Sequence, residues 1–345
     1  ILNDKTELDN YEPKQVNINF IEGAFVEILG DDPSKYEIKF INSKNGEVIY
    51  ETIISNNQWC KTNLTYYVDW EIQIKGIGNT YKKTFKFNPK DNKIFISFET
   101  KSLGDTIAFI PYVEEFRKKR NCKVVCSTFH NNLFETKYPN IEFVNPGSVS
   151  NNVSALYRLG LFYSNNEIDY NKHPSDPIKE PLQKIASDIL GLEFKEIKPL
   201  ITTYDVKKKK QVCIAIHSTA QAKYWNNPKG WQQVVDFLKL NGYEVILLSK
   251  EEDGYMGNKN PIGIIQQPPS DLKTIIKTLQ ESEFFIGISS GLSWLAWASG
   301  IPVILISGFT DIYLEPFKDI ERVINKNVCN GCWHTHKFDP GDWNW

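Results

Sequence analysis

Over roughly the first hundred residues, apolar and polar side chains alternate. Apolar residues recur at every second position in three segments: Val16, Ile18 and Phe20; Tyr36, Ile38 and Phe40; and Trp70, Ile72 and Ile74. A period of two is typical of antiparallel strands with one buried face. Turn sequences such as Asn45-Gly46 separate these segments. The pattern predicts a small all-β domain, a sandwich or barrel, over residues 1–98, with the strand 94–98 leading out of it.

Beyond residue 98 the period changes. Five short apolar runs are suited to parallel strands buried on both faces: residues 123–127, 212–217, 244–249, 284–288 and 303–307. Segments with helical spacing lie between them, as in Trp231, Val234, Val235 and Leu238. Strands that alternate with helices of this length predict βαβ units and doubly wound, Rossmann-like sheets.

We expect two such α/β lobes, at residues 99–205 and 206–325, followed by a C-terminal segment at 326–345. The boundary between the lobes falls in a polar stretch at residues 197–211, which includes four consecutive lysines at 207–210. We interpret the lysine run as a solvated linker, not as a nucleic-acid site. Two lobes that face each other across a cleft form the GT-B architecture of glycosyltransferases.

Composition narrows the function classes. The chain has 345 residues and a formal net charge of −2, so bulk charge favours neither nucleic acid nor an anionic membrane as a partner. The sequence has no apolar run of about 18 residues that would predict a membrane span. Its first 15 residues are polar and lack the pattern of a signal peptide, which predicts a cytoplasmic protein.

Six cysteines in a chain of this length do not indicate a disulfide framework. Four of them lie in or beside strand-like runs and are expected to be small buried thiols: Cys60, Cys122, Cys126 and Cys213.

The first candidate site follows the predicted strand 94–98. Gly104 allows a tight turn and the close approach of a ligand. Asp105 falls at the carboxyl end of the strand, where open α/β sheets bind ligands. Its carboxylate either accepts the proton of an attacking hydroxyl group or simply caps the helix. Pro111 predicts a bend in this helix or a later start.

The second candidate site follows the first strand of the second lobe. Ser218 and Thr219 carry hydroxyl groups and backbone N–H groups suited to a phosphate, and Lys223 adds a positive charge. His217 is either a ligand contact or a histidine whose hydrogen bonds are satisfied at the end of a strand. Lys223 is either a phosphate ligand or an ordinary surface lysine.

The third candidate site lies where strand 284–288 runs into a helix. The residues there are Ser289, Ser290, Gly291, Leu292 and Ser293. A helix N-terminus offers unpaired N–H groups and partial positive charge to a diphosphate. The alternative is a tight turn capped by serine. Lys250, at another strand end, either touches the nucleotide or the sugar or belongs to a solvated loop.

Near the C-terminus, Cys329 and Cys332 form a CxxC pair that bends through Gly331. Two thiolates at this spacing are half of a tetrahedral zinc or iron site. His334 and His336 are possible further ligands. The alternative is a pair of ordinary reduced thiols.

These motifs together resemble a known family. Leu103-Gly104-Asp105, the Lys223 loop and the loop 290–293 are similar to motifs of the ADP-heptose-dependent heptosyltransferases. More narrowly, the chain resembles the bacterial autotransporter heptosyltransferases. The features that match this narrower group are the β domain with its sequence at residues 19–23, the run 291–298 and the terminal CxxC.

The resemblance implies an inverting glycosyltransferase that moves heptose from ADP-heptose to serine hydroxyls of an autotransporter adhesin. It gives Asp105 the role of general base and Lys223 that of diphosphate ligand, with His217, Ser218 and Thr219 nearby. It assigns the phosphate and the sugar to Ser290–Ser293. It also implies that catalysis needs no metal, that the CxxC belongs to a structural four-cysteine iron site, and that the protein forms homo-oligomeric rings.

Two alternatives to this function stay open. The first keeps the enzyme class and changes the substrate to another nucleotide sugar or to a lipopolysaccharide core acceptor. The second is a non-catalytic scaffold that binds a nucleotide sugar.

Overall fold

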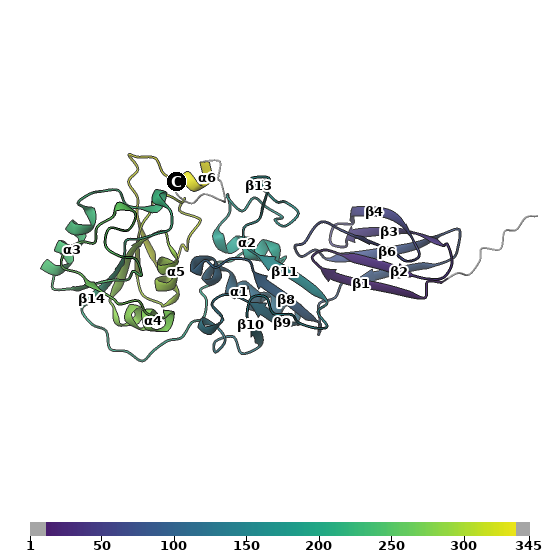
Figure 1. Ribbon diagram of the computed structural model, residues 1–345, viewed down its shortest axis with the longest axis horizontal. Coiled ribbons are helices and arrows are strands. Elements are labelled where there is room, and N and C mark those ends of the chain that lie inside the picture. The colour runs from purple at the N-terminus through teal and green to yellow at the C-terminus, as the bar shows by residue number, and fades with distance from the viewer. Residues whose placement is uncertain (1–11, 336–345) are drawn as a thin grey trace, which may run out of the picture.

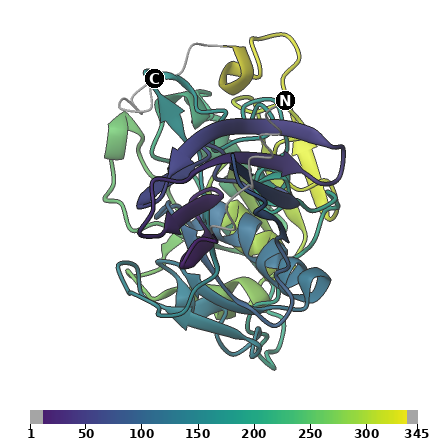
Figure 2. The same cartoon turned by 90° about the vertical axis from the view of Figure 1, so that its right-hand side faces the viewer.

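The computed structural model describes residues 12–335, in which three parts follow one another along the long axis (Figure 1). An all-β domain lies at one end, a first α/β lobe in the middle and a second α/β lobe at the other end. Viewed along the long axis, the β domain lies in front of the lobes (Figure 2). The predicted fold class, two Rossmann-like lobes of the GT-B type preceded by a small β domain, is confirmed.

The β domain consists of two facing sheets. One is antiparallel in the order β4-β3-β6-β7, and the other is formed by β1, β2 and β5. The strands are β1 Gln15–Ile21, β2 Phe25–Leu29, β3 Lys35–Asn42, β4 Glu47–Ser55, β5 Gln58–Lys61, β6 Trp70–Ile77 and β7 Lys82–Lys86. Tyr36, Ile38 and Phe40 of β3 are fully buried, whereas the residues between them are only half-buried. The predicted period of two is confirmed, because the alternate side chains form the core between the sheets.

Strand β1 belongs to the β domain and to the first lobe at once. It pairs antiparallel with β2 and parallel with β11 (Ala155–Leu159), through Phe20 with Ala155 and Ile21 with Leu156. One sheet of seven strands, in the order β10-β9-β8-β11-β1-β2-β5, therefore crosses the domain boundary. Backbone hydrogen bonds join the β domain to the lobe, so no free linker separates them at this strand.

The first lobe is built on the parallel part of this sheet. Its strands are β8 Lys93–Phe98, β9 Lys123–Ser127, β10 Ile141–Val144 and β11, and its helices are α1 Leu103–Arg120 and α2 Leu182–Ile189. It also contains the turn η1 (Asn131–Leu133) and a small hairpin of β12 (Tyr163–Ser164) and β13 (Glu167–Ile168). Because β8 pairs with both β9 and β11, we place it in the first lobe. The predicted boundary after Phe98 put this strand with the β domain.

Helix α1 begins immediately after Ser102, whose hydroxyl accepts the backbone N–H of Asp105 as an N-cap. It continues through Pro111 to Arg120 and ends at Asn121, which adopts a left-handed conformation. Of the two predicted effects of Pro111, the later start was wrong, because the serine cap fixes the first turn upstream of the proline. The bend stays a prediction. Of the helices that the structure describes, none has the length and apolarity needed to cross a bilayer.

The second lobe contains a parallel sheet of six strands in the order β16-β15-β14-β17-β18-β19. The strands are β14 Gln211–Ala215, β15 Glu244–Leu247, β16 Ile265–Gln266, β17 Phe284–Ile288, β18 Val303–Ile306 and β19 Ile320–Val323. The helices are α3 Gly230–Leu240, α4 Leu272–Glu281 and α5 Gly291–Ala298, with the short turns η2 Gln221–Lys223 and η3 Tyr255–Gly257. Every residue of β14 is buried, as expected for a parallel strand covered on both faces.

The lysine run 207–210 before β14 is exposed, as both a solvated linker and a nucleic-acid site would be, so its interpretation as a linker stays a prediction. The prediction that Cys60, Cys122, Cys126 and Cys213 are buried is confirmed. Burial raises the pKa of the Cys60 and Cys213 thiols to about 12, so both are protonated thiols near neutral pH.

Candidate active site between the two lobes

The amino ends of helices α1 and α5 meet where the lobes touch. A Cβ atom placed on Gly291 would lie 3.0 Å from the Cβ of Leu103 and 3.2 Å from the backbone nitrogen of Gly104. A Cβ on Gly104 would lie 3.1 Å from the Cδ1 of Trp294 and 3.6 Å from the Cα of Gly291. The two glycines therefore allow backbone-to-backbone approach, which sets two partially positive helix ends beside each other.

Asp105 lies in the first turn of α1 at this junction. Its carboxylate accepts a hydrogen bond of 2.9 Å from the hydroxyl of Thr100. Because Ser102 provides the N-cap, the alternative in which Asp105 caps the helix was wrong. Burial raises the pKa of Asp105 above its ordinary value, against the opposing effects of the Thr100 and Ser102 hydroxyls and of the Lys223 charge. A carboxylate with a raised pKa is a better proton acceptor.

Lys223 lies in the second lobe at the end of η2, near enough for its charge to act on Asp105. Burial lowers the pKa of the Lys223 ammonium group, whereas the charges of Asp105 and Glu315 raise it. The ammonium nitrogen lies 5.3 Å from the centroid of the Phe309 ring. The structure thus brings the two predicted key residues close enough for each charge to affect the other. An anionic group between the lobes would meet Lys223 and the end of α5 together.

The serine loop before α5 uses its three hydroxyl groups differently. Ser289 donates to Glu315, and Ser293 donates to the carbonyl of Ile288 at 2.6 Å. Ser290 occupies the N-cap position, but its hydroxyl makes no capping bond. This hydroxyl is buried and has no hydrogen-bond partner within residues 12–335. No serine hydroxyl caps the helix, so that part of the alternative was wrong. A ligand contact of the Ser290 hydroxyl stays a prediction. Leu292 is half-buried beside it.

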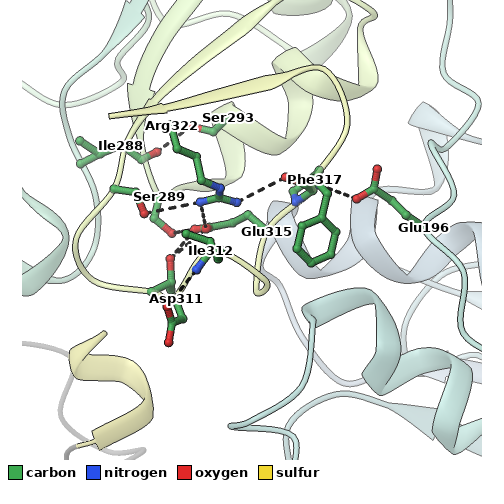
Figure 3. Close-up of polar contacts among 12 residues, drawn as sticks. Glu196, Ile288, Ser289, Ser293, Asp311, Ile312, Glu315, Phe317 and Arg322 are labelled. Atoms are coloured by element: carbon green, nitrogen blue, oxygen red, sulfur yellow. Dashed lines mark hydrogen bonds and ion pairs between the residues drawn. The ribbon is translucent and has the colours of Figure 1, made fainter. Parts of the chain in front are cut away.

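A buried ionic cluster lies behind this loop (Figure 3). The Glu315 carboxylate, only 5% exposed, accepts hydrogen bonds from the hydroxyls of Ser289 and Thr310. It also forms an ion pair with Arg322 at 2.9 Å. The cluster fixes the loop through the hydroxyl of Ser289. Sequence reasoning missed Thr310, Glu315 and Arg322, because no periodicity or motif marks the segment after β18.

Glu196, in the segment that joins the lobes, reaches the same region. Its carboxylate accepts the backbone N–H groups of Phe317 and Lys318, the latter at 3.1 Å (Figure 3). These residues follow Glu315 closely in the chain. The joining segment is therefore tied to the loop that carries the ionic cluster.

The residues at the end of β14 agree only partly with their predicted roles. His217 is buried, and its Nδ1 lies 2.8 Å from the hydroxyl of Ser249, a neighbour that sequence reasoning missed. Burial lowers the pKa of His217, so its ring is neutral near pH 7. The N–H of Ser218, predicted to be available to a phosphate, donates to the Tyr224 hydroxyl at 3.2 Å. Thr219 is exposed.

Lys250 is exposed to solvent. Its side chain is 85% exposed, and its ammonium group is 3.8 Å from Glu251. These contacts fit the alternative of a solvated loop, and its nucleotide contact stays a prediction.

The CxxC pair ends at Cys332, the first residue of the short helix α6 (Cys332–Thr335). Cys329 is exposed and Cys332 is half-buried. Across residues 12–335, no group of three or more His, Cys, Asp or Glu side chains gathers as a metal site would require. Two thiolates supply half of a tetrahedral ligand set. The predicted ligand His336 lies outside the described residues.

Comparison with known proteins assigns the family. Residues 140–339 match glycosyltransferase family 9 (heptosyltransferase). The autotransporter heptosyltransferase Aah of Escherichia coli is 36% identical over 324 residues, which cover 90% of this chain and 81% of Aah. The chain belongs to the autotransporter heptosyltransferases of glycosyltransferase family 9. It is a glycosyltransferase by family and by fold.

Solved structures agree with this assignment. The crystal structure of TibC from enterotoxigenic E. coli H10407, described as an iron-containing dodecameric glycosyltransferase, superposes with a TM-score of 0.86 at 31% identity. It covers 98% of this chain and 89% of the TibC chain. A second TibC structure, in complex with ADP-D-beta-D-heptose, gives a TM-score of 0.85 at 31% identity over 100% of this chain and 91% of that chain.

One relative separates family membership from activity. BimC of Burkholderia thailandensis, named an inactive autotransporter heptosyltransferase, is 31% identical over 290 residues, or 80% of this chain and 67% of BimC. Whether a member of this family is active therefore depends on the residues of its own site and not on family membership alone.

The pKa shifts predict a narrowed pH profile for transfer. Because the pKa of Asp105 is raised, its carboxylate becomes protonated on acidification at a pH above the ordinary pKa of 3.8. Because the pKa of Lys223 is lowered, its ammonium group loses its proton at a pH below the ordinary pKa of 10.5. We therefore expect a bell-shaped dependence of kcat/KM on pH, with an acid limb above 3.8 and an alkaline limb below 10.5. Initial rates over the stable pH range test this, and an acid limb at or below 3.8 would contradict it.

Proposed function

We propose that this chain transfers heptose from ADP-heptose to serine hydroxyl groups of an autotransporter protein. The observation that carries the proposal is that Asp105 and Lys223, from opposite lobes, lie near enough for each charge to act on the other, where the amino ends of α1 and α5 meet. The family of the chain and its similarity to TibC, solved with ADP-D-beta-D-heptose, support the choice of donor.

In the proposed reaction, Asp105 accepts the proton of the acceptor serine hydroxyl. The serine oxygen forms a bond to the anomeric carbon of the heptose while the bond from that carbon to the diphosphate oxygen breaks. The electron pair of the broken bond leaves with ADP. One displacement from the side opposite the leaving group inverts the anomeric configuration.

The second lobe stabilises the leaving diphosphate. The Lys223 ammonium group and the N–H groups at the start of α5 neutralise the charge that develops on ADP. The buried Ser290 hydroxyl donates a hydrogen bond to the same diphosphate or to the sugar. With these groups in place, the departure of ADP needs no catalytic metal. His217, 92% of whose surface is covered, lines the site as a neutral ring.

The acceptor class is tested by mass spectrometry. We expect a candidate autotransporter, incubated with the purified chain and ADP-heptose, to gain increments of one heptose that map to serine residues. A lipopolysaccharide core fragment and a UDP-sugar serve as the competing acceptor and donor. Transfer to the core fragment alone, or from the UDP-sugar alone, would change the substrate and keep the enzyme class.

The scaffold alternative has support in BimC, the relative named inactive. It requires that ADP binds to the parent chain and that no acceptor is modified. An autotransporter of unchanged mass, in a reaction where ADP-heptose binding is measured directly, would favour the scaffold.

We also propose that the CxxC binds structural iron, that the chain forms a homo-oligomer and that it works in the cytoplasm. TibC, described as iron-containing and dodecameric, supports the first two. Cys329 and Cys332 would supply two thiolate ligands, and the others would come from outside the described residues.

A further inference from the structure

Phe309 lies against the ammonium group of Lys223. The distance of 5.3 Å from the nitrogen to the ring centroid is within the range of a cation–π interaction. Phe309 is only 4% exposed, and desolvation strengthens this attraction over that of an exposed pair. The face of the ring therefore favours one position of a long, otherwise flexible side chain.

The backbone of Phe309 is held on both sides. Its carbonyl accepts the N–H of Trp333 at 3.1 Å, and the carbonyl of Gly308 accepts the N–H of Gly331 at 2.8 Å. On the other side, the hydroxyl of the adjacent Thr310 bonds both oxygens of Glu315, at 2.9 and 2.8 Å. The ring position is thus fixed between the C-terminal segment and the buried ionic cluster.

Trp333 packs directly on the Phe309 ring. Their centroids are 5.8 Å apart with the planes at 56°, and Trp333 is 7% exposed. Leu161 and Tyr163 of the first lobe, and Ala222 next to Lys223, pack against this pair. The C-terminal segment therefore contacts both lobes at the side of the site that holds Lys223.

We propose that Phe309 and Trp333 are positioning residues for Lys223: the Phe309 ring holds the ammonium group where it meets the donor diphosphate, and Trp333 holds the ring. The proposal rests on the proposed function of Lys223 as a diphosphate ligand. It adds that the segment 329–335 is a wall of the donor site, beyond any role of its cysteines.

The test is the affinity for ADP, measured by calorimetry on the full chain. We expect Phe309→Leu to weaken ADP binding about tenfold, because leucine fills similar apolar space without a π face. Phe309→Tyr keeps the ring and is expected to retain the parent affinity. Trp333→Leu is expected to weaken binding in the same direction, and it keeps the proposal testable if Phe309→Leu does not fold.

A double-mutant cycle separates positioning from packing. In a Lys223→Met background, Phe309→Leu is expected to cause no further loss of ADP affinity. Phe284→Leu is the matched control, because Phe284 packs on Tyr243 at 5.7 Å at the far end of β17. It is expected to bind ADP as the parent does.

Each outcome has a distinct meaning. Parent-like ADP affinity in Phe309→Leu, or an equal loss with and without Lys223, would overturn the positioning role and leave the proposed function intact. A parent chain that neither binds ADP nor transfers heptose would remove the proposed function, and the positioning role with it.

Discussion

Asp105→Asn is expected to lower kcat by about 10²–10⁴-fold while the affinity for ADP stays unchanged. The amide keeps the size and the polar contact with Thr100 but does not accept the proton of the acceptor hydroxyl. The lost interaction is made only in the transition state, so KM for the donor should change little. Single-turnover transfer rates and calorimetric ADP binding measure the two quantities separately.

Stability gives this variant a second signature. Because the pKa of Asp105 is raised in the folded chain, the stability it contributes is present below its unfolded pKa and is lost as the pH rises through the raised value. Above the raised pKa the ionised carboxylate therefore opposes folding, and the neutral amide removes that cost. The Tm of Asp105→Asn should equal or exceed that of the parent.

The matched control is Asp236→Asn, the same change at an exposed position on α3. It should leave transfer and Tm unchanged. A fall in Tm of Asp105→Asn together with its activity would show that the carboxylate is structural, and a variant that still transfers heptose would remove Asp105 as the general base.

Lys223→Met is expected to weaken ADP binding by about 10- to 100-fold and to lower kcat as well. A hydrogen bond to a charged group contributes about 1.5–3 kcal/mol, and every 1.4 kcal/mol is a factor of ten in affinity. Charge on the departing diphosphate grows as the bond to the sugar breaks, so the same ammonium group stabilises the transition state more than the ground state.

Methionine retains the unbranched apolar stem of lysine, which keeps the packing of the stem in the buried site. Lys277→Met, on the exposed face of α4, is the matched control and should bind ADP as the parent does. A Lys223→Met chain with parent-like ADP affinity would place the diphosphate elsewhere.

Regular elements were predictable because their side chains repeat. The period of two found β3 and β6, and the apolar runs found β14 and β17, since burial on one or both faces imposes these patterns. The position of β8 was not predictable. Its apolar run is the same whether the strand ends one domain or begins another, and only its pairing with β9 and β11 decides.

Part of the site followed from the same logic. Strand ends carry Asp105, Lys223 and Ser290 toward the junction, because parallel strands present their carboxyl ends at one edge of a sheet. Glu315 and Phe309 were not found, since they lie in a loop after β18 whose side chains follow no helical or strand period. Trp333 was visible in the sequence beside the CxxC, but its neighbour across space, Phe309, was not.

The pairing of β1 with β11 has a consequence for how an acceptor would be presented. Arg158 of β11 also forms ion pairs with Glu22, just past β1, and with Glu99, just past β8, the latter at 2.7 Å. Without β1, the backbone of β11 would become an open edge, the kind that recruits foreign strands. The amino-terminal domain therefore shares a continuous sheet with the first lobe and is not an independent domain on a linker. An acceptor polypeptide bound to this domain would therefore be held at a fixed distance and orientation relative to Asp105.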